Sequence, residues 1–403
     1  MRPLRARILV LVIALLAAAC GSAGTTTTDG GAATTAADGG ATTTAADGGA
    51  TTTEAEAGAT TTTEADAETT TTAAAERETL IVAIGNLRAI QYFPIYVADA
   101  GGYFDDEGLD VEIEIVSGSG AVVQQLIAGN VDVMLASPAA AINAVAGGQD
   151  LATFCSTHYQ SIFTLAVPTE SGITDVAGLD GATIGISEPS GGEVPVVRAA
   201  LATADLVEEE NYTLLAIGEG GQLTFEALSN GDADAYSSSV FDVAAVEAAG
   251  LALTHVLPDE FLYVPSIGLT VTRETLENRS DALARFGRAY AKANTWGSQP
   301  ENREAVNELI RPYNEELFED PAFVDAVWEA TIRLTTPPPD LEGEPYCSHY
   351  IPGWETYVAA ASEAPEEEGG LAGPVDIAAM ADMSLLDQIN DFDPSSVDPP
   401  TGG

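Results

Sequence analysis

Hydrophobic and polar positions change their spacing twice within one stretch of the chain. Apolar and acidic residues alternate from Leu109 to Ile115, which is the period of a strand with one buried face. After a Ser-Gly-Ser-Gly turn at 117–120, the apolar residues of 121–128 share one face of a predicted helix. The nearly all-apolar run 131–135 is typical of a strand buried on both faces. This order predicts a parallel sheet with right-handed crossovers, in which ligands bind where strands end, here at 117–120 and Ser137-Pro138.

A similar unit occurs a second time along the chain. Residues 127–138 read I-x-GNVDVMLASP, and residues 228–239 read L-x-NGDADAYSSS. Two copies of one strand–helix–strand unit predict an α/β protein with two lobes and mostly parallel sheets. Further strands are predicted at 80–84, 151–156, 163–167, 182–186, 212–217 and 261–272, and further helices at 275–297, 302–311, 321–334, 354–362 and 375–390.

The N-terminus has the pattern of an export signal. Three arginines precede an apolar run at 8–16, and small residues lead from there to Cys20. The apolar run is too short to span a bilayer. Small residues before a cysteine resemble a lipobox, in which the thiol is acylated after cleavage. We therefore expect a signal peptide at 1–19 and a lipid anchor on Cys20 that holds the protein outside the cytoplasm on the cell membrane; plain secretion is the alternative.

The segment that follows is low in complexity. Asp-Gly-Gly recurs within runs of Thr and Ala, and alanine supplies the only apolar side chains, so this segment cannot form a core. A disordered tether is therefore expected at 20–77. The sequence predicts that the later parts are lobe 1 (78–170), lobe 2 (171–262), a return to lobe 1 with C-terminal helices (263–390), and a disordered tail (391–403).

Charge narrows the choice of partners. The 403 residues include 62 acidic and 14 basic side chains, and the net charge is −48. Such a surface repels nucleic acid and anionic lipid headgroups. Nucleic acid is therefore excluded as a partner, whereas the fold is not constrained by this charge.

The stretch from Gly102 to Pro138 resembles a known family. GYF-x-x-EGLDVEI, the Gly/Ser turn, Q-x-L-x-x-G-x-VDV and the small-residue SP are similar to the nitrate/sulfonate/taurine and thiamine-pyrimidine-precursor branch of ABC-transporter solute-binding proteins. The resemblance covers residues 79–390 and is strongest up to residue 275. It implies a periplasmic-binding-protein type II fold with a hinge cleft between two lobes, and an ABC permease as partner.

Three glycine-rich loops, at 117–120, 190–192 and 218–221, each follow a predicted strand and enter a predicted helix, and they are candidate ligand loops. Glycine lets backbone N–H groups approach a ligand, and a helix N-terminus adds partial positive charge; the alternative is that these are ordinary turn glycines. The resemblance implies that the loop and helix start at 86–93 also line the cleft. The ligand-binding candidates are Asn86, Arg88, Gln91, Tyr92, Ser117, Gly118, Ser119, Ser137, Ser187, Glu188, Ser190, Gly191, Gly192, Glu193, Gly221, Gln222, Tyr236 and Ser237.

Two ligand chemistries fit these loops. Glu188, Glu193, Glu219 and Asp242 lie near the predicted openings, and carboxylates beside tyrosines suit a neutral or cationic ring such as an aminopyrimidine. Arg88 instead suits a sulfonate or nitrate anion, because a guanidinium offers paired N–H donors. The acidic residues tilt the balance slightly toward an organic solute with a ring or an amine.

Cys155 and Cys347 remain once Cys20 is set aside. In an oxidising compartment the first interpretation is a disulfide between them. His158 and His349 lie close to the two cysteines in sequence, so a zinc site is an alternative. A third interpretation makes Cys155 a nucleophile with His158 as its base. The resemblance gives this last idea some support, since relatives of the fold include desulfinases and a pyrimidine synthase.

Together these patterns predict a monomeric binding protein without cofactor, metal or enzymatic activity. It would bind a small organic solute, aminopyrimidine-like or a sulfonate/nitrate-type anion, in the interlobe cleft. Hinge closure would then present the loaded protein to a permease. The alternatives are an enzyme on the same scaffold and a ligand-sensing receptor subunit without a transport role.

Overall fold

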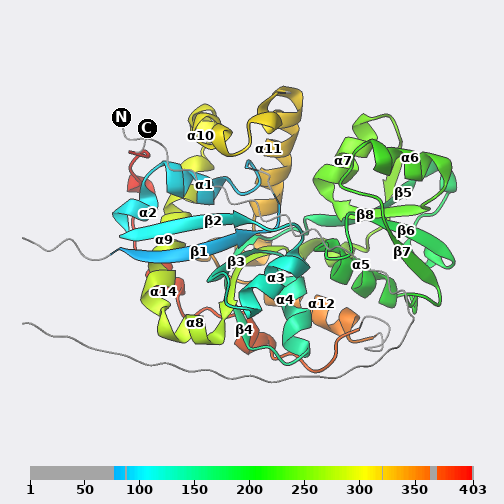
Figure 1. Cartoon of the computed structure of the whole chain (residues 1–403), viewed down its shortest axis with the longest axis horizontal. Coiled ribbons are helices and arrows are strands. Elements are labelled where there is room, and N and C mark those ends of the chain that lie inside the picture. Colours follow the sequence, from blue (N-terminus) through cyan, green and yellow to red (C-terminus); the bar gives the residue numbers. More distant parts are fainter. Residues whose placement is uncertain (1–76, 87–88, 320, 364–369, 402–403) are drawn as a thin grey trace, which may run out of the picture. The chain divides into compact units, whose positions relative to one another are not determined.

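A computed structural model describes residues 77–86, 89–319, 321–363 and 370–401 (Figure 1). The predicted signal peptide, Cys20 and nearly all of the predicted tether lie outside these residues, as does Arg88. Within the described part, no helix has both the length and the apolar character that crossing a membrane requires.

The first sheet is built from residues that are far apart in sequence. Its strand order is β2-β1-β3-β10-β4. The two strands β1 and β3 alternate their buried side chains between two apolar clusters, so that Val82 packs on one face and Ala83 on the other. This is the burial expected of a strand covered on both faces. The strands are β1 (Glu78–Ile84), β2 (Leu109–Ile115), β3 (Val133–Ala136), β4 (Leu151–His158) and β10 (Ile267–Thr272).

Helices cover both faces of this first sheet. One cluster packs α1 and α9 against it, and the other packs α3, α4 and α12, which Figure 1 shows close together. The helices of this lobe are α1 (Phe93–Ala100), α2 (Tyr103–Asp106), α3 (Ser119–Ile127), α4 (Pro138–Ala146), α8 (Arg273–Asn278), α9 (Ser280–Gly297), α10 (Arg303–Ile310), α11 (Pro321–Thr335), α12 (Ile351–Ala361), α13 (Ile377–Met380) and α14 (Leu386–Ile389).

The second sheet has the order β7-β6-β8-β5-β9. Leu165, Ile184 and Val197 belong to one of its apolar clusters, and Ala166, Tyr236 and Val243 belong to the other. Its strands are β5 (Phe163–Pro168), β6 (Ala182–Ile186), β7 (Tyr212–Ala216), β8 (Ala235–Ser239) and β9 (Leu253–His255), and its helices are α5 (Glu193–Ala202), α6 (Gln222–Asn230) and α7 (Val240–Ala248).

The α/β prediction with two lobes is confirmed, but the sheets are mixed rather than mostly parallel. In the first sheet β1 pairs in parallel with β2 and β3, whereas β10 runs antiparallel to both of its neighbours. In the second sheet β5 is the corresponding antiparallel strand. Both are the strands by which the chain enters a lobe from the other one. They therefore arrive from the opposite end, a direction that local periodicity does not encode.

Several predicted boundaries differ from the structure. The second sheet begins with β5 at Phe163, before the predicted start of lobe 2 at residue 171. The helix expected at 375–390 is reduced to the short helices α13 and α14. The tail after residue 391 was predicted to be disordered, yet its described part is bonded to the first lobe. Tyr103 donates its hydroxyl hydrogen to the carbonyl of Asp398, and the N–H of Thr401 donates to Gly101.

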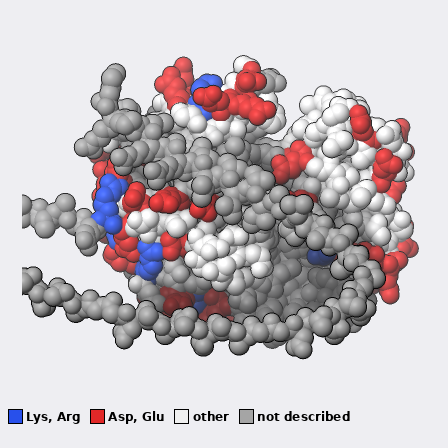
Figure 2. All heavy atoms as spheres, viewed as in Figure 1, with Lys and Arg blue, Asp and Glu red and all other residues white. Residues whose placement is uncertain are grey.

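Basic residues of α9 join segments of the first lobe. Arg288 and Lys292 both contact Glu107, each at 2.8 Å, and Arg285 contacts Glu78 at 3.0 Å. Elsewhere acidic side chains dominate the visible surface, with Lys and Arg confined to a few places (Figure 2). The scarce cations thus serve internal contacts, and the net charge is left on the surface.

Candidate functional site

A small cleft lies between loops of the two lobes. Its cavity volume is about 40 Å³. The loops that follow β1 and β2 supply one wall, and the loops that follow β6 and β7, the end of β8 and the start of α7 supply the other. The lining residues are Gly85, Asn86, Tyr92, Gly118, Ser119, Ile162, Phe163, Ser187, Glu188, Gly191, Gly192, Glu193, Glu219, Ser238, Ser239, Asp242 and Ile267.

Two of the predicted glycine loops touch each other across this cleft. The N–H of Gly120, in the first turn of α3, donates to the carbonyl of Ser190 at 3.0 Å. Gly118 has φ +82°, and a Cβ there would lie 2.5 Å from Oε1 of Glu188 and 2.6 Å from the oxygen of Ser190. Only glycine fits such a backbone and such a contact. The first turn of α3 is therefore held against the second lobe.

Glu193 is the most deeply buried carboxylate of the cleft, with 2% of its surface exposed. It begins α5 and accepts hydrogen bonds from the N–H of Ser187, at 2.8 Å, and from the Ser187 hydroxyl. Burial raises its pKa to about 7, although the Ser187 hydrogen bonds oppose that shift. Near neutral pH this carboxyl therefore exists in both forms, and it can accept or donate a hydrogen bond.

Other acidic groups surround the same opening. Burial and the neighbouring charge of Glu219 raise the pKa of Glu188. Asp242, at the start of α7, accepts hydrogen bonds from the hydroxyls of Ser238 and Ser239 at 2.7 and 2.6 Å. The second-lobe wall thus combines four carboxyl groups with serine hydroxyls that donate hydrogen bonds to two of them, Glu193 and Asp242.

The first-lobe wall presents an aromatic ring and an amide. Asn86 donates through its amide nitrogen to the Tyr92 hydroxyl at 3.5 Å. The Oδ1 atom of Asn86 is buried and has no hydrogen-bond partner among the described residues. A buried acceptor without a partner is costly. A ligand that brings an N–H donor would satisfy it.

The structure brings nine of the eighteen predicted ligand residues to the cleft and places eight others outside its lining. Asn86, Tyr92, Gly118, Ser119, Ser187, Glu188, Gly191, Gly192 and Glu193 line it. Tyr236 lies in the second-lobe core, where its hydroxyl donates to Gly218 and accepts from Gly220, so it shapes the loop instead of lining the cleft. The residues outside the lining are Gln91, Ser117, Ser137, Ser190, Gly221, Gln222, Tyr236 and Ser237, and Arg88 is not described.

Sequence reasoning missed the apolar part of the cleft. Ile162 and Phe163 lie where the chain crosses into the second lobe, and Ile267 begins the strand that returns to the first. Their position depends on the two crossings of the chain between the lobes, which end at β5 and β10. A run of apolar residues carries no signal of that exchange. Ser238 and Ser239 could have been found, because they directly follow the predicted strand in the second repeat.

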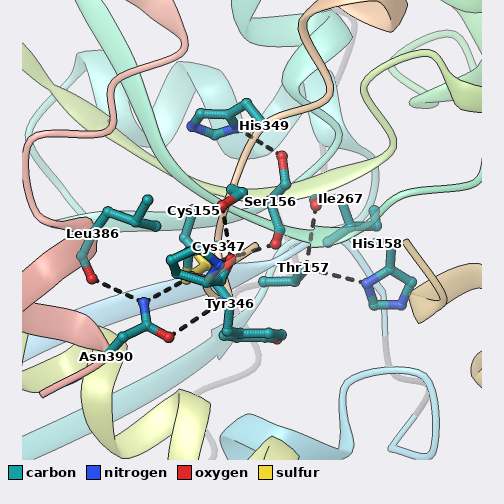
Figure 3. The surroundings of a disulfide bond; sticks show 12 residues. Cys155, Ser156, Thr157, His158, Ile267, Tyr346, Cys347, His349, Leu386 and Asn390 are labelled. Atoms are coloured by element: carbon teal, nitrogen blue, oxygen red, sulfur yellow. Dashed lines mark hydrogen bonds between the residues drawn. A yellow bond between two sulfur atoms is a disulfide. The ribbon is translucent and has the colours of Figure 1, made fainter. Parts of the chain in front are cut away.

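Cys155, on β4, forms a disulfide with Cys347 (Figure 3), as predicted. The two histidines turn to other partners: Nδ1 of His349 lies 2.7 Å from the Ser156 hydroxyl, and Nδ1 of His158 lies 3.1 Å from the Thr157 hydroxyl. The zinc and nucleophile interpretations are wrong in this structure, because both sulfur atoms are bonded to each other. Burial lowers the pKa of both histidines to about 4.

Comparisons with known proteins agree with this architecture. The model of the NMT1/THI5-like family matches residues 89–302, more than half of the chain. A protein of Bordetella bronchiseptica RB50 is 21% identical with a TM-score of 0.64, over 78% of this chain and 98% of that one. No curated protein matches the sequence.

Two further solved structures share the fold. The periplasmic aliphatic sulphonate-binding protein SsuA of Escherichia coli is 17% identical with a TM-score of 0.51, over 64% of this chain and 85% of that one. A Candida albicans protein described as having the generic periplasmic binding protein fold is also 17% identical, with a TM-score of 0.51, over 74% of this chain and 98% of that one. The predicted periplasmic-binding-protein fold is thereby confirmed.

Proposed function

The chain belongs to the NMT1/THI5-like family, and from this premise we propose that it is the solute-binding component of an ABC importer. The observation that carries the proposal is the cleft at the strand ends of both lobes, where a buried carboxyl, an unpaired amide oxygen and an aromatic ring converge. Polar groups of this kind, few and convergent, are typical of small-molecule sites. A binding role without catalysis fits the disulfide, because it removes the Cys155 thiol as a nucleophile.

The proposed ligand is an organic ring that carries amino groups, an aminopyrimidine being the type. Amino hydrogens would satisfy the Asn86 oxygen, and the ring would pack on Tyr92. A carboxyl with pKa near 7, such as that of Glu193, pairs with an aminopyrimidine either as the acid or as the ion. An anion would instead have to approach Glu188, Glu193 and Glu219, which costs electrostatic energy.

Ligand entry requires the lobes to separate. Ligand pockets usually measure about 300–1,000 Å³, whereas the cavity here is about 40 Å³. The hydrogen bond from Gly120 to Ser190 crosses the opening and has to break first. We therefore propose hinge opening at 159–162 and 256–266, ligand capture, and reclosure into the form that a permease recognises.

The anion alternative rests on one residue and two helix ends. Arg88 would supply paired N–H donors, and the first turns of α3 and α5 face the cleft. The E. coli protein SsuA, which shares the fold, binds aliphatic sulphonates, so sulfonates belong among the ligands to be tested. A sensing role without transport would use the same cleft and differs only in what the closed lobes contact.

Thermal unfolding with a ligand panel tests the ligand class. Aminopyrimidines at about a hundred times their dissociation constant should stabilise the protein by roughly 2.7 kcal/mol, whereas taurine, alkanesulfonates and nitrate should not. Glu193→Gln should abolish most of the shift. Glu247→Gln, an exposed position on α7, is the matched control and should keep it. A shift with sulfonates that disappears in Arg88→Gln would instead establish the anion class.

Export and anchoring are proposed on sequence grounds. The extracytoplasmic location fits the disulfide and the family, and the lipid on Cys20 would keep the binding domain near its permease. Cys20→Ser should move the protein from the membrane fraction to the medium if the lipid is the anchor. An unchanged membrane fraction would exclude a lipid at Cys20 as the sole attachment. The monomeric state remains a proposal that gel filtration can test.

A further inference from the structure

The first lobe contains a second cavity, far larger than the cleft. Its volume is about 350 Å³, and none of its lining residues lines the cleft. It lies among α11, the end of α9 and the segment 335–348 that follows α11. We propose that this cavity, which we name the hinge-side cavity, binds a neutral, planar aromatic molecule.

The size of the hinge-side cavity suits a small ligand. Sites for small molecules usually enclose about 300–1,000 Å³. Most of its wall comes from residues after 302, beyond the region that the family model matches. The family therefore gives no reason for the cavity, and its origin lies in the C-terminal part of this chain.

Its walls are rich in aromatic side chains. Phe93, Tyr159, Trp328 and Tyr346 all line it. The rings of Phe93 and Trp328 lie 5.3 Å apart at a tilt of 43°. Phe93 and Trp328 are each 2% exposed, so a planar ring would meet them over a small area, where ring contacts would add to the burial of area in a way that an aliphatic chain cannot match.

One polar side chain among the lining residues has no hydrogen-bond partner within the described residues. Thr331 is 1% exposed, and its hydroxyl makes no hydrogen bond within the described structure. Two neighbouring threonines behave differently: the hydroxyls of Thr335, the last residue of α11, and of Thr336, just after it, donate to carbonyls one turn earlier. Buried hydroxyls are nearly always paired. A ligand with a hydrogen-bonding edge would supply the missing partner of Thr331.

Charge excludes an anion from the hinge-side cavity. Glu344 is the only charged residue among its lining residues, and it is exposed. An anionic ligand would meet this carboxylate and no lining cation, because Arg303, whose guanidinium lies 5.5 Å from the centre of the Trp328 ring, is not among the lining residues; it would therefore lose hydration with little compensation. The ligand class that fits is a neutral ring with one polar substituent, such as a phenol or an aromatic amide.

Hydrogen bonds and the disulfide join the walls of the cavity beside the segment that crosses to the second lobe. The N–H groups of Tyr159 and Gln160, which start the crossing to the second lobe, both donate to the carbonyl of Leu334, at 2.8 and 3.1 Å. On the opposite wall, Tyr346 and Ser348 flank Cys347, which the disulfide joins to β4. Preformed walls of this kind lower the entropy cost of binding a small molecule.

Ligand-observed NMR on the mature protein tests the proposal. The probes are p-cresol and nicotinamide as neutral rings, with benzoate as the anionic analogue. Both neutral probes should bind at millimolar concentration and benzoate more weakly. Ser298→Trp, which fills the mouth, should abolish binding. Thr331→Val should weaken it about 3- to 10-fold, the usual loss of one hydrogen bond, whereas Thr335→Val should not.

The outcome is distinguishable from failure of the proposed transport function. Glu193→Gln alters the cleft only, so it should leave probe binding unchanged, and each variant must retain cooperative unfolding. The proposal is overturned if no neutral ring binds, if Ser298→Trp binds as well as the parent, or if benzoate binds as tightly as nicotinamide. Loss of probe binding in Glu193→Gln would also overturn it, because the probe would then occupy the cleft.

Discussion

Single atoms decide whether the two lobes can meet. At Gly118 the space that a Cβ would need is already filled by Glu188 and Ser190 of the other lobe. At Glu193 the burial that closes the cleft also raises the pKa of the carboxyl. Both residues were predicted as ligand contacts from sequence. The structure adds that Gly118 lies against the second lobe and that Glu193 is buried beside it.

Gly118→Ala should impair closure of the lobes in addition to the stability that it loses through backbone strain. A side chain at positive φ costs about 1–3 kcal/mol, and here a Cβ would also strike the second lobe. Gly129→Ala is the matched control, since Gly129 has φ +71° and open space around it. Both variants should lose stability in urea unfolding, but only Gly118→Ala should weaken ligand binding by calorimetry. Equal affinities for the two variants would refute a role of Gly118 in closure.

The pKa of Glu193 predicts how stability changes with pH. Burial raises it from 4.5 to about 7, so the folded protein holds a proton that the unfolded chain releases. The resulting stabilisation is complete below pH 4.5 and is lost as the pH rises through 7. The free energy of unfolding should therefore be on the order of 3 kcal/mol higher below pH 4.5 than well above pH 7 through this one group. Glu193→Gln should remove this pH dependence when unfolding is measured at pH 4.5 and pH 8; identical pH profiles would contradict the assignment.

Helix α9 organises the first lobe at the scale of elements. It packs against α1, α2 and α14, and its basic residues reach Glu78, the first residue of β1, and Glu107, just before β2. Burial alone would raise the pKa of Glu107, but the hydrogen bonds and charges of Arg288 and Lys292 together outweigh burial, so the pKa is lowered. The helix therefore contacts the starts of β1 and β2 through ion pairs as well as through apolar side chains.

Glu107→Gln should destabilise the protein by roughly 1–3 kcal/mol, because Arg288 and Lys292 would lose their shared partner. Asp281→Asn is the control on the same helix: Asp281 also pairs with an arginine, but its side chain is 86% exposed, against 10% for Glu107. Its loss should be at most about 0.5 kcal/mol. Chemical unfolding measures both. Similar losses would show that burial does not separate these ion pairs.

The whole molecule carries a strong negative field. Acidic side chains spread over the face shown in Figure 2, and 62 acids oppose 14 bases in the chain. Such a field concentrates cations near an acidic cleft and repels anions. The field and the carboxyl groups of the cleft therefore favour the same ligand class.

Salt should weaken the binding of a cationic ligand more than the binding of a neutral one. Raising ionic strength from about 20 mM to about 0.5 M shortens the screening length several-fold, so the affinity for a protonated aminopyrimidine should fall severalfold. A pyrimidine that is neutral at the same pH is the control and should change little. Calorimetry at both salt concentrations gives the comparison. An affinity that rises with salt would instead indicate an anionic ligand.

Local sequence determined most of the elements and the polar loops on both walls of the cleft. The alternation at 109–115, the apolar runs of β1 and β3, and the glycine loops at Gly118 and Gly191 follow from residue spacing and backbone sterics, which act over a few residues. The repeated unit also gave the two lobes. These features need no knowledge of distant contacts, and the structure agrees with them.

Tertiary structure alone decided which segments meet. The two crossings of the chain between the lobes, which end at β5 and β10, bring Ile162, Phe163 and Ile267 to the cleft. They also make the sheets mixed, because β5 and β10 run antiparallel to their neighbours. The hinge-side cavity likewise joins Phe93 and Tyr159 to residues after 294. Contacts between segments this far apart depend on chain direction and on packing of the whole lobe. Periodicity within one segment contains neither, so the sequence by itself left the ligand class and the second cavity undetermined.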